Sequence, residues 1–382
     1  MTKAGVVDPV APPSPARGGG AVARPVPASE RIAALDALRG LAILGVLASY
    51  TLWNLGSPPP ETWSGIDRVV NVAGEVLIDT KFLTIFAFLF GAGVSQQWRR
   101  AQAAGASVWA LHARRMTFLL AVGLLHGALL RNGDILAPYA ILGLVLFAIS
   151  GSSSRALAVA AVVLAFLPYV NQIVLRAAEW SLAARPGPAA GNLDWLLFWY
   201  RTNPILSWPR ILALMVAGVL AERTGLIARV AAERGLARAV LLSGLLLAIA
   251  GRGALMLVAR QPATFTQGVV TNFTYHATAW SQAAAYAGGL ALLCQREVWV
   301  ERLGPLRAVG RMAFTNYLLQ AVLIVPLCLA LGLFDRVTPT VGLALAFGVA
   351  SLQVPLSVRW LRRHRYGPLE ALWRHVTYGP AN

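Results

Sequence analysis

The chain has 382 residues, of which 57% are hydrophobic and 13% are charged. Soluble domains usually carry about 25% charged residues, so this composition excludes a soluble globular fold and indicates a polytopic, all-α integral membrane protein. The net charge of +17 comes from arginines scattered between apolar runs, which fits membrane topology and argues against a nucleic-acid partner.

The first segment, residues 1–30, is rich in proline and contains the run Gly18–Gly20. We expect it to be a disordered cytoplasmic tail, because such a composition cannot bury enough apolar surface to fold. The apolar run behind it is too long for a secretory signal and lacks a small-residue cleavage site.

Long apolar runs then follow one another over residues 31–358. Because a spanning helix needs about 20 residues, we predict a bundle of about ten transmembrane helices in the lipid bilayer. The predicted spans are residues 32–53, 75–97, 111–131, 134–150, 155–177, 207–222, 236–258, 275–295, 309–333 and 338–358. Arginines are concentrated in alternate connections, which predicts that both termini are cytoplasmic. Neither an internal repeat nor a broken pair of helices is evident, and this argues against an inverted-repeat transporter.

The first predicted span carries an acid and a base, Asp36 and Arg39. Their i and i+3 spacing puts both side chains on one helix face, where they can pair. A charge costs about 2.5–3.5 kcal/mol at the centre of a membrane helix, so the pair should face the bundle interior or a wet cavity. One interpretation is a substrate site in which Arg39 binds a phosphate or carboxylate, and the other is a pair that anchors the helix end.

Lys81 lies in the second span and is one of only two lysines in a chain with 31 arginines. A lysine inside a span under this bias indicates a specific role, and we expect it to contribute to substrate binding. The alternative is an interfacial anchor made by Asp79 and Lys81.

His126 lies near the outer end of the third span, and Asp134 opens the fourth span after a short turn. The hairpin therefore brings an imidazole close to a carboxylate, which can fix its tautomer and raise its basicity. These residues are the candidate catalytic base and its orienting acid. The alternative is a buried histidine bonded to a neighbouring helix, with Asp134 as a helix N-cap.

Asn316 and Gln320 share one face of the ninth span at i and i+4. We expect them to contact substrate, with Asn316 as a donor to a developing oxyanion; hydrogen bonding between helices is the alternative. Cys294 and Cys328 lie in apolar spans without disulfide or metal-ligand spacing, so no metal site is expected.

The C-terminal segment, residues 359–382, is not a span. Pro368 can begin a short helix there, and Glu370, Trp373 and Arg374 make that helix amphipathic. We expect it to lie at the cytoplasmic face, either as an interfacial anchor or as part of the entrance for a ligand.

Five motifs follow one another along the chain: Leu35–Gly40, Lys81–Gly91, Leu125–His126 with Gly133–Leu136, Gly310–Gln320 and Tyr366–Arg374. Together and in this order they resemble the bacterial YeiB-like membrane proteins, a family with a domain of unknown function. The resemblance implies a multi-pass protein of the bacterial inner (cytoplasmic) membrane. It also implies a relationship to transmembrane acyltransferases, which move an acyl group from cytoplasmic acyl-CoA to an acceptor. One branch of that group has a histidine eleven residues after the first-span arginine, where this chain has Tyr50.

We therefore expect an acyltransferase with acyl-CoA as co-substrate, which enters beside Asp36 and Arg39. Arg311 and Arg374 are among the arginines expected to hold its phosphates. His126 would act on a hydroxyl or amine of an outer-face acceptor, a cell-envelope glycan or lipid. This hypothesis requires one cavity that joins Arg39 to His126. A transporter or export partner, and a membrane scaffold without chemistry, are the alternatives.

Overall fold

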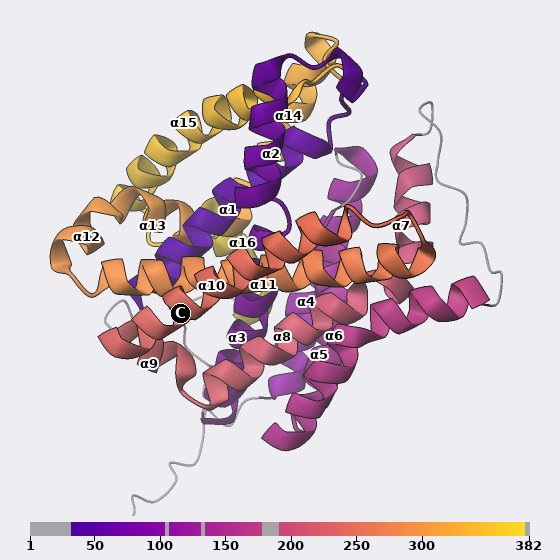
Figure 1. The fold of residues 1–382 in the computed structure, drawn as a ribbon. Helices are drawn as coiled ribbons and strands as arrows, with labels where there is room; N and C mark the ends of the chain where they lie inside the picture. Colours follow the sequence, from indigo (N-terminus) through magenta and orange to yellow (C-terminus); the bar gives the residue numbers. More distant parts are fainter. Residues whose placement is uncertain (1–31, 104–106, 131–133, 178–190, 379–382) are drawn as a thin grey trace, which may run out of the picture.

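The computed structural model describes residues 32–103, 107–130, 134–177 and 191–378, which form helices joined by turns, without strands (Figure 1). The helices are α1 Ala33–Trp53, the 3-10 turn η2 Pro60–Thr62, α2 Gly65–Leu77, α3 Lys81–Ala103, α4 Val108–Leu129, α5 Leu136–Ile149, α6 Ser154–Ala177, α7 Asn192–Leu206, α8 Trp208–Arg223, α9 Leu226–Ala232, α10 Arg234–Val258, α11 Phe265–Cys294, α12 Glu297–Arg302, α13 Gly304–Arg311, α14 Ala313–Ala330, α15 Pro339–Arg363 and α16 Pro368–Tyr378. The all-α prediction is confirmed for these residues, whereas the predicted tail, residues 1–30, lies outside them.

Seven described segments are long and apolar enough to cross a membrane: α1, α2 with α3, α4, α6, α10, α14 and α15. α7 and α8 pass the same test as a bent pair, which gives eight. α5 is apolar but has only 14 residues, and α11 carries polar residues such as Ser281 and Gln282 along its length. The prediction of a helical protein with membrane-length apolar segments is confirmed, but the count of ten spans is not.

α7 and α8 meet at an angle of 62°, so the expectation that the chain contains no broken helix pair is wrong. The break lies at Ser207, just before Pro209, whose missing N–H cannot bond to the carbonyl of Ile205. That carbonyl instead accepts a hydrogen bond from Asn171 Nδ2 of α6 at 2.8 Å. The neighbouring helix thus satisfies the backbone group that the bend leaves open.

α2 is a helix that the hydropathy pattern did not predict, because only its end overlaps an apolar run. A capping box begins it: Asp67 N donates to Ser64 Oγ at 3.1 Å, and Ser64 N donates to Asp67 Oδ2 at 3.1 Å. This local signal in the sequence marks the start of the helix.

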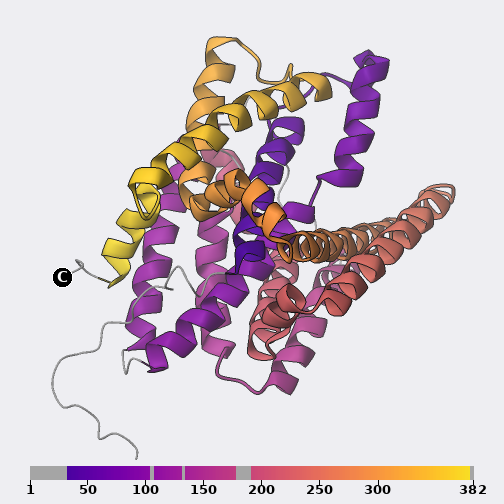
Figure 2. The same ribbon diagram turned by 90° about the vertical axis from the view of Figure 1, so that its left-hand side faces the viewer.

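α1 is the central helix and contacts α3, α11, α13, α14 and α15. Its apolar residues fill the core, in which Ala37, Ile43 and Val46 are grouped with Phe82 and Val309. α10 and α11 form a long antiparallel hairpin that projects from one side of the bundle (Figure 2). The core around α1 therefore determines where Asp36 and Arg39 lie relative to the other helices.

α1 and α13 cross at two glycines, Gly40 and Gly310. A Cβ at Gly310 would overlap the carbonyl oxygen of Asp36, and a Cβ at Gly40 would overlap that of Leu306. The two backbones therefore touch, which small residues allow in membrane proteins. The crossing fixes the relative positions of Asp36 and Arg311, the residue after Gly310.

We expect Gly310→Ala to destabilise the protein by about 1–3 kcal/mol, because the added methyl group must push α13 away from α1. Gly304→Ala in the same helix is the control, since a Cβ there has no neighbour within 4 Å. Thermal unfolding in detergent should give a lower midpoint for Gly310→Ala and an unchanged or higher midpoint for Gly304→Ala. Equal midpoints for the two variants would contradict the close crossing.

Candidate functional site

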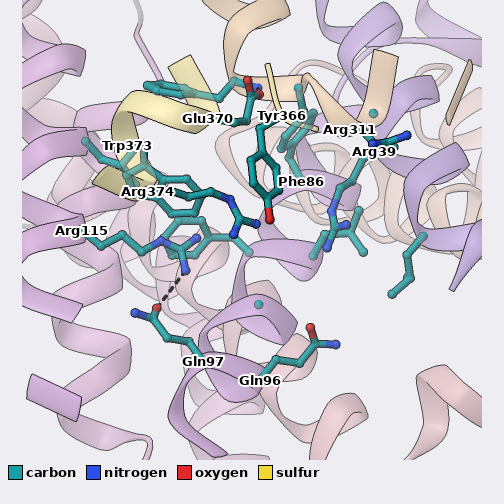
Figure 3. A pocket seen from close by; sticks show the side chains of 18 of the residues that line it. Arg39, Phe86, Gln96, Gln97, Arg115, Arg311, Tyr366, Glu370, Trp373 and Arg374 are labelled. Carbon is teal, nitrogen blue, oxygen red and sulfur yellow. Dashed lines mark hydrogen bonds between the residues drawn. The ribbon is translucent and has the colours of Figure 1, made fainter. Parts of the chain in front are cut away.

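A cavity of about 420 Å³, the basic cavity, is enclosed by α1, α3, α4, α13 and α16 together with neighbouring segments. Six arginines line it: Arg39, Arg100, Arg115, Arg311, Arg365 and Arg374. Among the described residues only Asp36 and Glu370 add carboxylates to the lining, which leaves an excess of four positive charges. Aromatic side chains, including Phe86 and Tyr366, lie between the arginines (Figure 3). The cavity therefore suits an anionic ligand with an apolar portion.

Arg115 of α4 is held by an amide and by two aromatic rings. Its Nη1 donates to Gln97 Oε1 at 2.9 Å (Figure 3). Its Cζ lies 5.4 Å from the centre of the Phe90 ring and 4.7 Å from that of Trp373. Its Nε has no hydrogen-bond partner within the described part of the chain. A guanidinium held in this way keeps donors for an anion that enters the cavity.

α16 forms one wall of the basic cavity and packs against α4 and α14. It contributes Glu370, Trp373 and Arg374 to the lining, and the Arg374 Cζ lies 4.0 Å from the centre of the Tyr366 ring. The sequence left open whether this helix is an interfacial anchor or part of a ligand entrance. Its place in the cavity wall favours the entrance.

Glu370 caps the first turn of α14 from outside that helix. Its Oε1 accepts hydrogen bonds from the backbone N–H groups of Phe314 and Thr315, at 2.8 and 3.1 Å, and its Oε2 accepts one from the Thr315 hydroxyl. Burial raises the pKa of the Glu370 carboxyl, and the hydrogen bonds from Thr315 and Phe314 offset part of that rise. Glu370 thus joins α16 to the N-terminus of α14, where a negative charge is favourable.

Asp36 and Arg39 line the basic cavity and pair with each other at 3.2 Å. The Arg39 side chain is 34% exposed and that of Asp36 is 8% exposed. The pair therefore faces a cavity, as the cost of placing charges in lipid predicts. Arg311 and Arg374, which were expected to hold ligand phosphates, lie in the same lining.

Tyr317 of α14 and Ile135 both line the basic cavity, and Ile135 N donates to Tyr317 Oη at 3.3 Å. Tyr317 Oη donates to Asp134 Oδ1 at 3.1 Å, and that oxygen also lies 2.9 Å from His126 Nδ1. A carboxylate can only accept a hydrogen bond, so Nδ1 is the donor to Asp134, and in the neutral imidazole the lone pair is then on Nε2. Nε2 is buried and has no hydrogen-bond partner among the residues that the structure describes.

The α4–α5 hairpin brings His126 and Asp134 together, as the sequence predicts. Asp134 Oδ2 also accepts a hydrogen bond from Ala137 N at 2.9 Å, so the same side chain caps α5. Gly123 permits this approach, because a Cβ there would overlap Ala137 N and lie 2.6 Å from Asp134 Oδ2. Asp134 therefore both orients the imidazole and begins the next helix.

His126 and Asp134 do not line the basic cavity. Their side chains are only 2% and 1% exposed, and Tyr317 lies between them and the cavity. The ring centres of His126 and Tyr317 are 5.2 Å apart. The expectation of one open cavity from Arg39 to His126 is therefore corrected: the cavity lining includes Tyr317 but neither His126 nor Asp134.

Asn316 and Gln320 lie outside the basic cavity, and their amides bond to neighbouring helices. Asn316 Nδ2 donates to Ser357 Oγ of α15 at 3.0 Å, and Gln320 Nε2 donates to the Ile43 carbonyl of α1 at 3.1 Å. Gln353 of α15 adds a bond to the Asn316 carbonyl at 2.9 Å. The structure therefore does not bring this pair to the cavity, because interhelical hydrogen bonds use their donors.

Lys81 lies at the junction of α2 and α3, also away from the basic cavity. Its Nζ donates to the Glu75 carbonyl, which accepts a second hydrogen bond from Arg252 Nη2 at 3.0 Å. Asp79 accepts a hydrogen bond from the Tyr275 hydroxyl. Arg252 and Tyr275 thus join this junction to α10 and α11, and the structure does not bring Lys81 to Arg39 or His126.

Arg115 and Tyr317 are the site residues that the sequence did not single out. Arg115 was one of many arginines at span ends, and Tyr317 was one of several polar residues on its span. A separate signal for Arg115 was its position about two turns inside α4, where a charge needs a polar environment. No three His, Cys, Asp or Glu side chains gather as metal ligands in the described ranges.

Comparison with known proteins identifies relatives that cover more than nine tenths of the chain. Residues 221–380 match the family described as "Protein of unknown function (DUF418)". The chain is similar to the uncharacterised protein YxaH of Bacillus subtilis (strain 168), with 27% identity over 93% of this chain and 96% of that protein. It is also similar to the uncharacterised protein YeiB of Escherichia coli (strain K12), with 28% identity over 92% of this chain and 98% of that protein. The chain is thus similar to the YeiB-like uncharacterised proteins over more than nine tenths of its length, and residues 221–380 carry the DUF418 match.

Proposed function

We propose that the protein is an acyl-CoA-dependent O- or N-acyltransferase of the bacterial inner membrane. The observation that carries this proposal is the basic cavity, in which six arginines surround a space that leads to Tyr317 and thus toward the His126–Asp134 pair. CoA combines several phosphates with a long arm, and arginine matches phosphate geometry well. The arginine distribution along the chain supports cytoplasmic termini and a donor that arrives from the cytoplasm.

In the proposed reaction, a hydroxyl or amine of a cell-envelope glycan or lipid attacks the thioester carbonyl carbon. A C–O or C–N bond forms and the C–S bond breaks. His126 Nε2 takes the proton from the attacking group and returns it to the leaving sulfur, which gives free CoA. Asp134 holds the ring through Nδ1 and stabilises the imidazolium that forms between these two transfers.

Tyr317 stands between the donor cavity and the base. The proposed reaction therefore requires its ring to turn aside when the acyl group arrives, which would break its hydrogen bond to Asp134. Asp134 would keep its bonds to His126 and to the start of α5, so the base would stay oriented.

CoA and acetyl-CoA at millimolar concentration are expected to raise the unfolding temperature of the purified protein in detergent. A ligand at 100 times its Kd stabilises the folded state by about 2.7 kcal/mol. Dephospho-CoA, which lacks one phosphate, should stabilise less, and pantetheine, which has none, should have no effect. The absence of a shift with every acyl-CoA would overturn the proposal.

The Arg374→Gln variant should lose most of this shift, because Arg374 lines the cavity. Arg362→Gln is the matched control, since Arg362 is exposed near the end of α15 and is not part of the lining. An equal loss in both variants would indicate a general effect of charge instead of binding in the basic cavity.

A transporter or export partner is the second candidate, and the bent pair of α7 and α8 favours it. Broken helices commonly form substrate sites in transporters. Proteoliposomes distinguish the two: a transporter accumulates a labelled ligand of the cavity unchanged, whereas an acyltransferase releases free CoA and labels an acceptor.

A further inference from the structure

A second basic site lies at the far end of the α10–α11 hairpin from its connecting turn, beside α9 and α12 at the left of Figure 1. It is a groove of about 360 Å³, and its lining includes Arg234, Arg238, Arg296 and Trp299. Arg234 and Arg238 are four residues apart on α10 and therefore share a face. Arg296 lies in the connection between α11 and α12, so three arginines, two from α10 and one from this connection, line one space.

The charge around this groove is positive. All three arginines are exposed, and no carboxylate among the described residues lines the groove. The acid nearest in sequence to Arg234 is Glu233, and its Oε1 accepts a hydrogen bond from Arg229 Nε at 2.8 Å. The groove thus has three cationic groups in its lining and no carboxylate among the described lining residues, an arrangement that suits a phosphate.

An apolar stripe on α10 continues from the arginines. Leu242, Leu245, Leu246 and Ile249 are 50%, 40%, 68% and 69% exposed and recur at helical spacing. Leu241 and Leu292 line the groove itself. Apolar side chains this exposed on a membrane-length helix require lipid chains as neighbours, and Trp299 is a residue typical of headgroup depth.

We infer that this groove binds an anionic phospholipid of the bilayer. The lipid phosphate lies among Arg234, Arg238 and Arg296, and one acyl chain follows the exposed leucines of α10. A soluble phosphate would use only the arginines, whereas the stripe gives a lipid a continuous apolar surface. The inference concerns a site separate from the basic cavity and does not depend on the proposed acyl transfer.

Native mass spectrometry of the full chain, delipidated in detergent and titrated with phosphatidylglycerol, tests this inference. One phosphatidylglycerol should bind more tightly than phosphatidylcholine at equal concentration. The triple variant Arg234→Gln, Arg238→Gln, Arg296→Gln should lower that affinity by roughly 100-fold, while the triple lysine variant should keep most of it. The matched control is Arg359→Gln, Arg362→Gln, Arg363→Gln, which removes three exposed arginines from the end of α15.

Circular dichroism and gel filtration should show that both glutamine variants remain folded, since the altered side chains are exposed. Equal loss of phosphatidylglycerol from the two triple variants would overturn the site, because it would show a general charge effect. If both triple variants keep the phosphatidylglycerol affinity of the unaltered protein, the proposed site is also overturned. Displacement of the lipid by glycerol phosphate at similar concentration would show that a soluble phosphate is the ligand, which also contradicts the inference.

Discussion

Replacing His126 with alanine is expected to lower acyl transfer by about 10²–10⁴-fold while leaving donor binding unchanged. The imidazole is held through Nδ1 by Asp134 at 2.9 Å, and its Nε2 is the buried nitrogen proposed to accept the proton. Because the His126 side chain does not line the basic cavity, its loss removes no contact to the donor phosphates. Transfer of label from acetyl-CoA to membrane material, measured beside the CoA-induced thermal shift, separates the two effects.

Asp134→Asn distinguishes a chemical role from a structural one. Asparagine can still accept the Ala137 N–H and begin α5, but it no longer fixes the imidazole as the carboxylate does. Transfer should fall while the thermal midpoint stays close to that of the unaltered protein. His364→Ala, at an exposed position at the end of α15, is the control and should transfer normally.

Normal acyl transfer by the His126→Ala variant would exclude His126 as the base.

The parts of the site that could be predicted from the sequence are those made by short-range contacts. Asp36 and Arg39 are one turn apart, and His126 meets Asp134 across a hairpin only eight positions long. Helical periodicity and a short turn determine such contacts, so the pairs could be identified without a tertiary structure.

The remaining contacts depend on how distant helices pack. Tyr317 lies 183 positions from Asp134, and Glu370 lies 55 positions from Thr315. Nothing in the local pattern indicates that Tyr317 would close the cavity in front of His126. The same limit applies to Asn316 and Gln320, whose i and i+4 spacing is equally compatible with a substrate face and with the bonds to α1 and α15 that they make.

In the fold, too, local patterns predicted some features and contacts between distant helices determined the others. Long apolar runs predicted the positions of helices, because the cost of exposing backbone groups in lipid leaves few other structures. The bend at Ser207 was not predicted, although Pro209 lies beside it. The hydrogen bond that makes the bend possible comes from Asn171 of another helix, and a local sequence pattern does not reveal that contact. Apolarity alone also could not place Lys81, which donates to the Glu75 carbonyl of α2, a group that also accepts a hydrogen bond from Arg252 of α10.

Replacing Arg115 with glutamine is expected to weaken CoA binding by about 10–100-fold, which corresponds to the loss of one charge-assisted contact to phosphate. The guanidinium contacts the rings of Phe90 and Trp373 and bonds to Gln97, so its position in the cavity wall is fixed before a ligand enters. The CoA affinity of Arg115→Lys should lie between those of the unaltered protein and Arg115→Gln, because lysine keeps the charge but loses the flat group that contacts the rings.

Arg114→Gln is the matched control for this effect. It changes the net charge by the same amount at the adjacent position, but Arg114 is exposed and does not line the basic cavity. Calorimetric titration with CoA should give a weaker Kd for Arg115→Gln and an unchanged one for Arg114→Gln. If both variants bind CoA with the affinity of the unaltered protein, the donor does not occupy this cavity. If both variants lose the same CoA affinity, binding depends on overall charge and not on the basic cavity, because Arg115 lines that cavity and Arg114 does not.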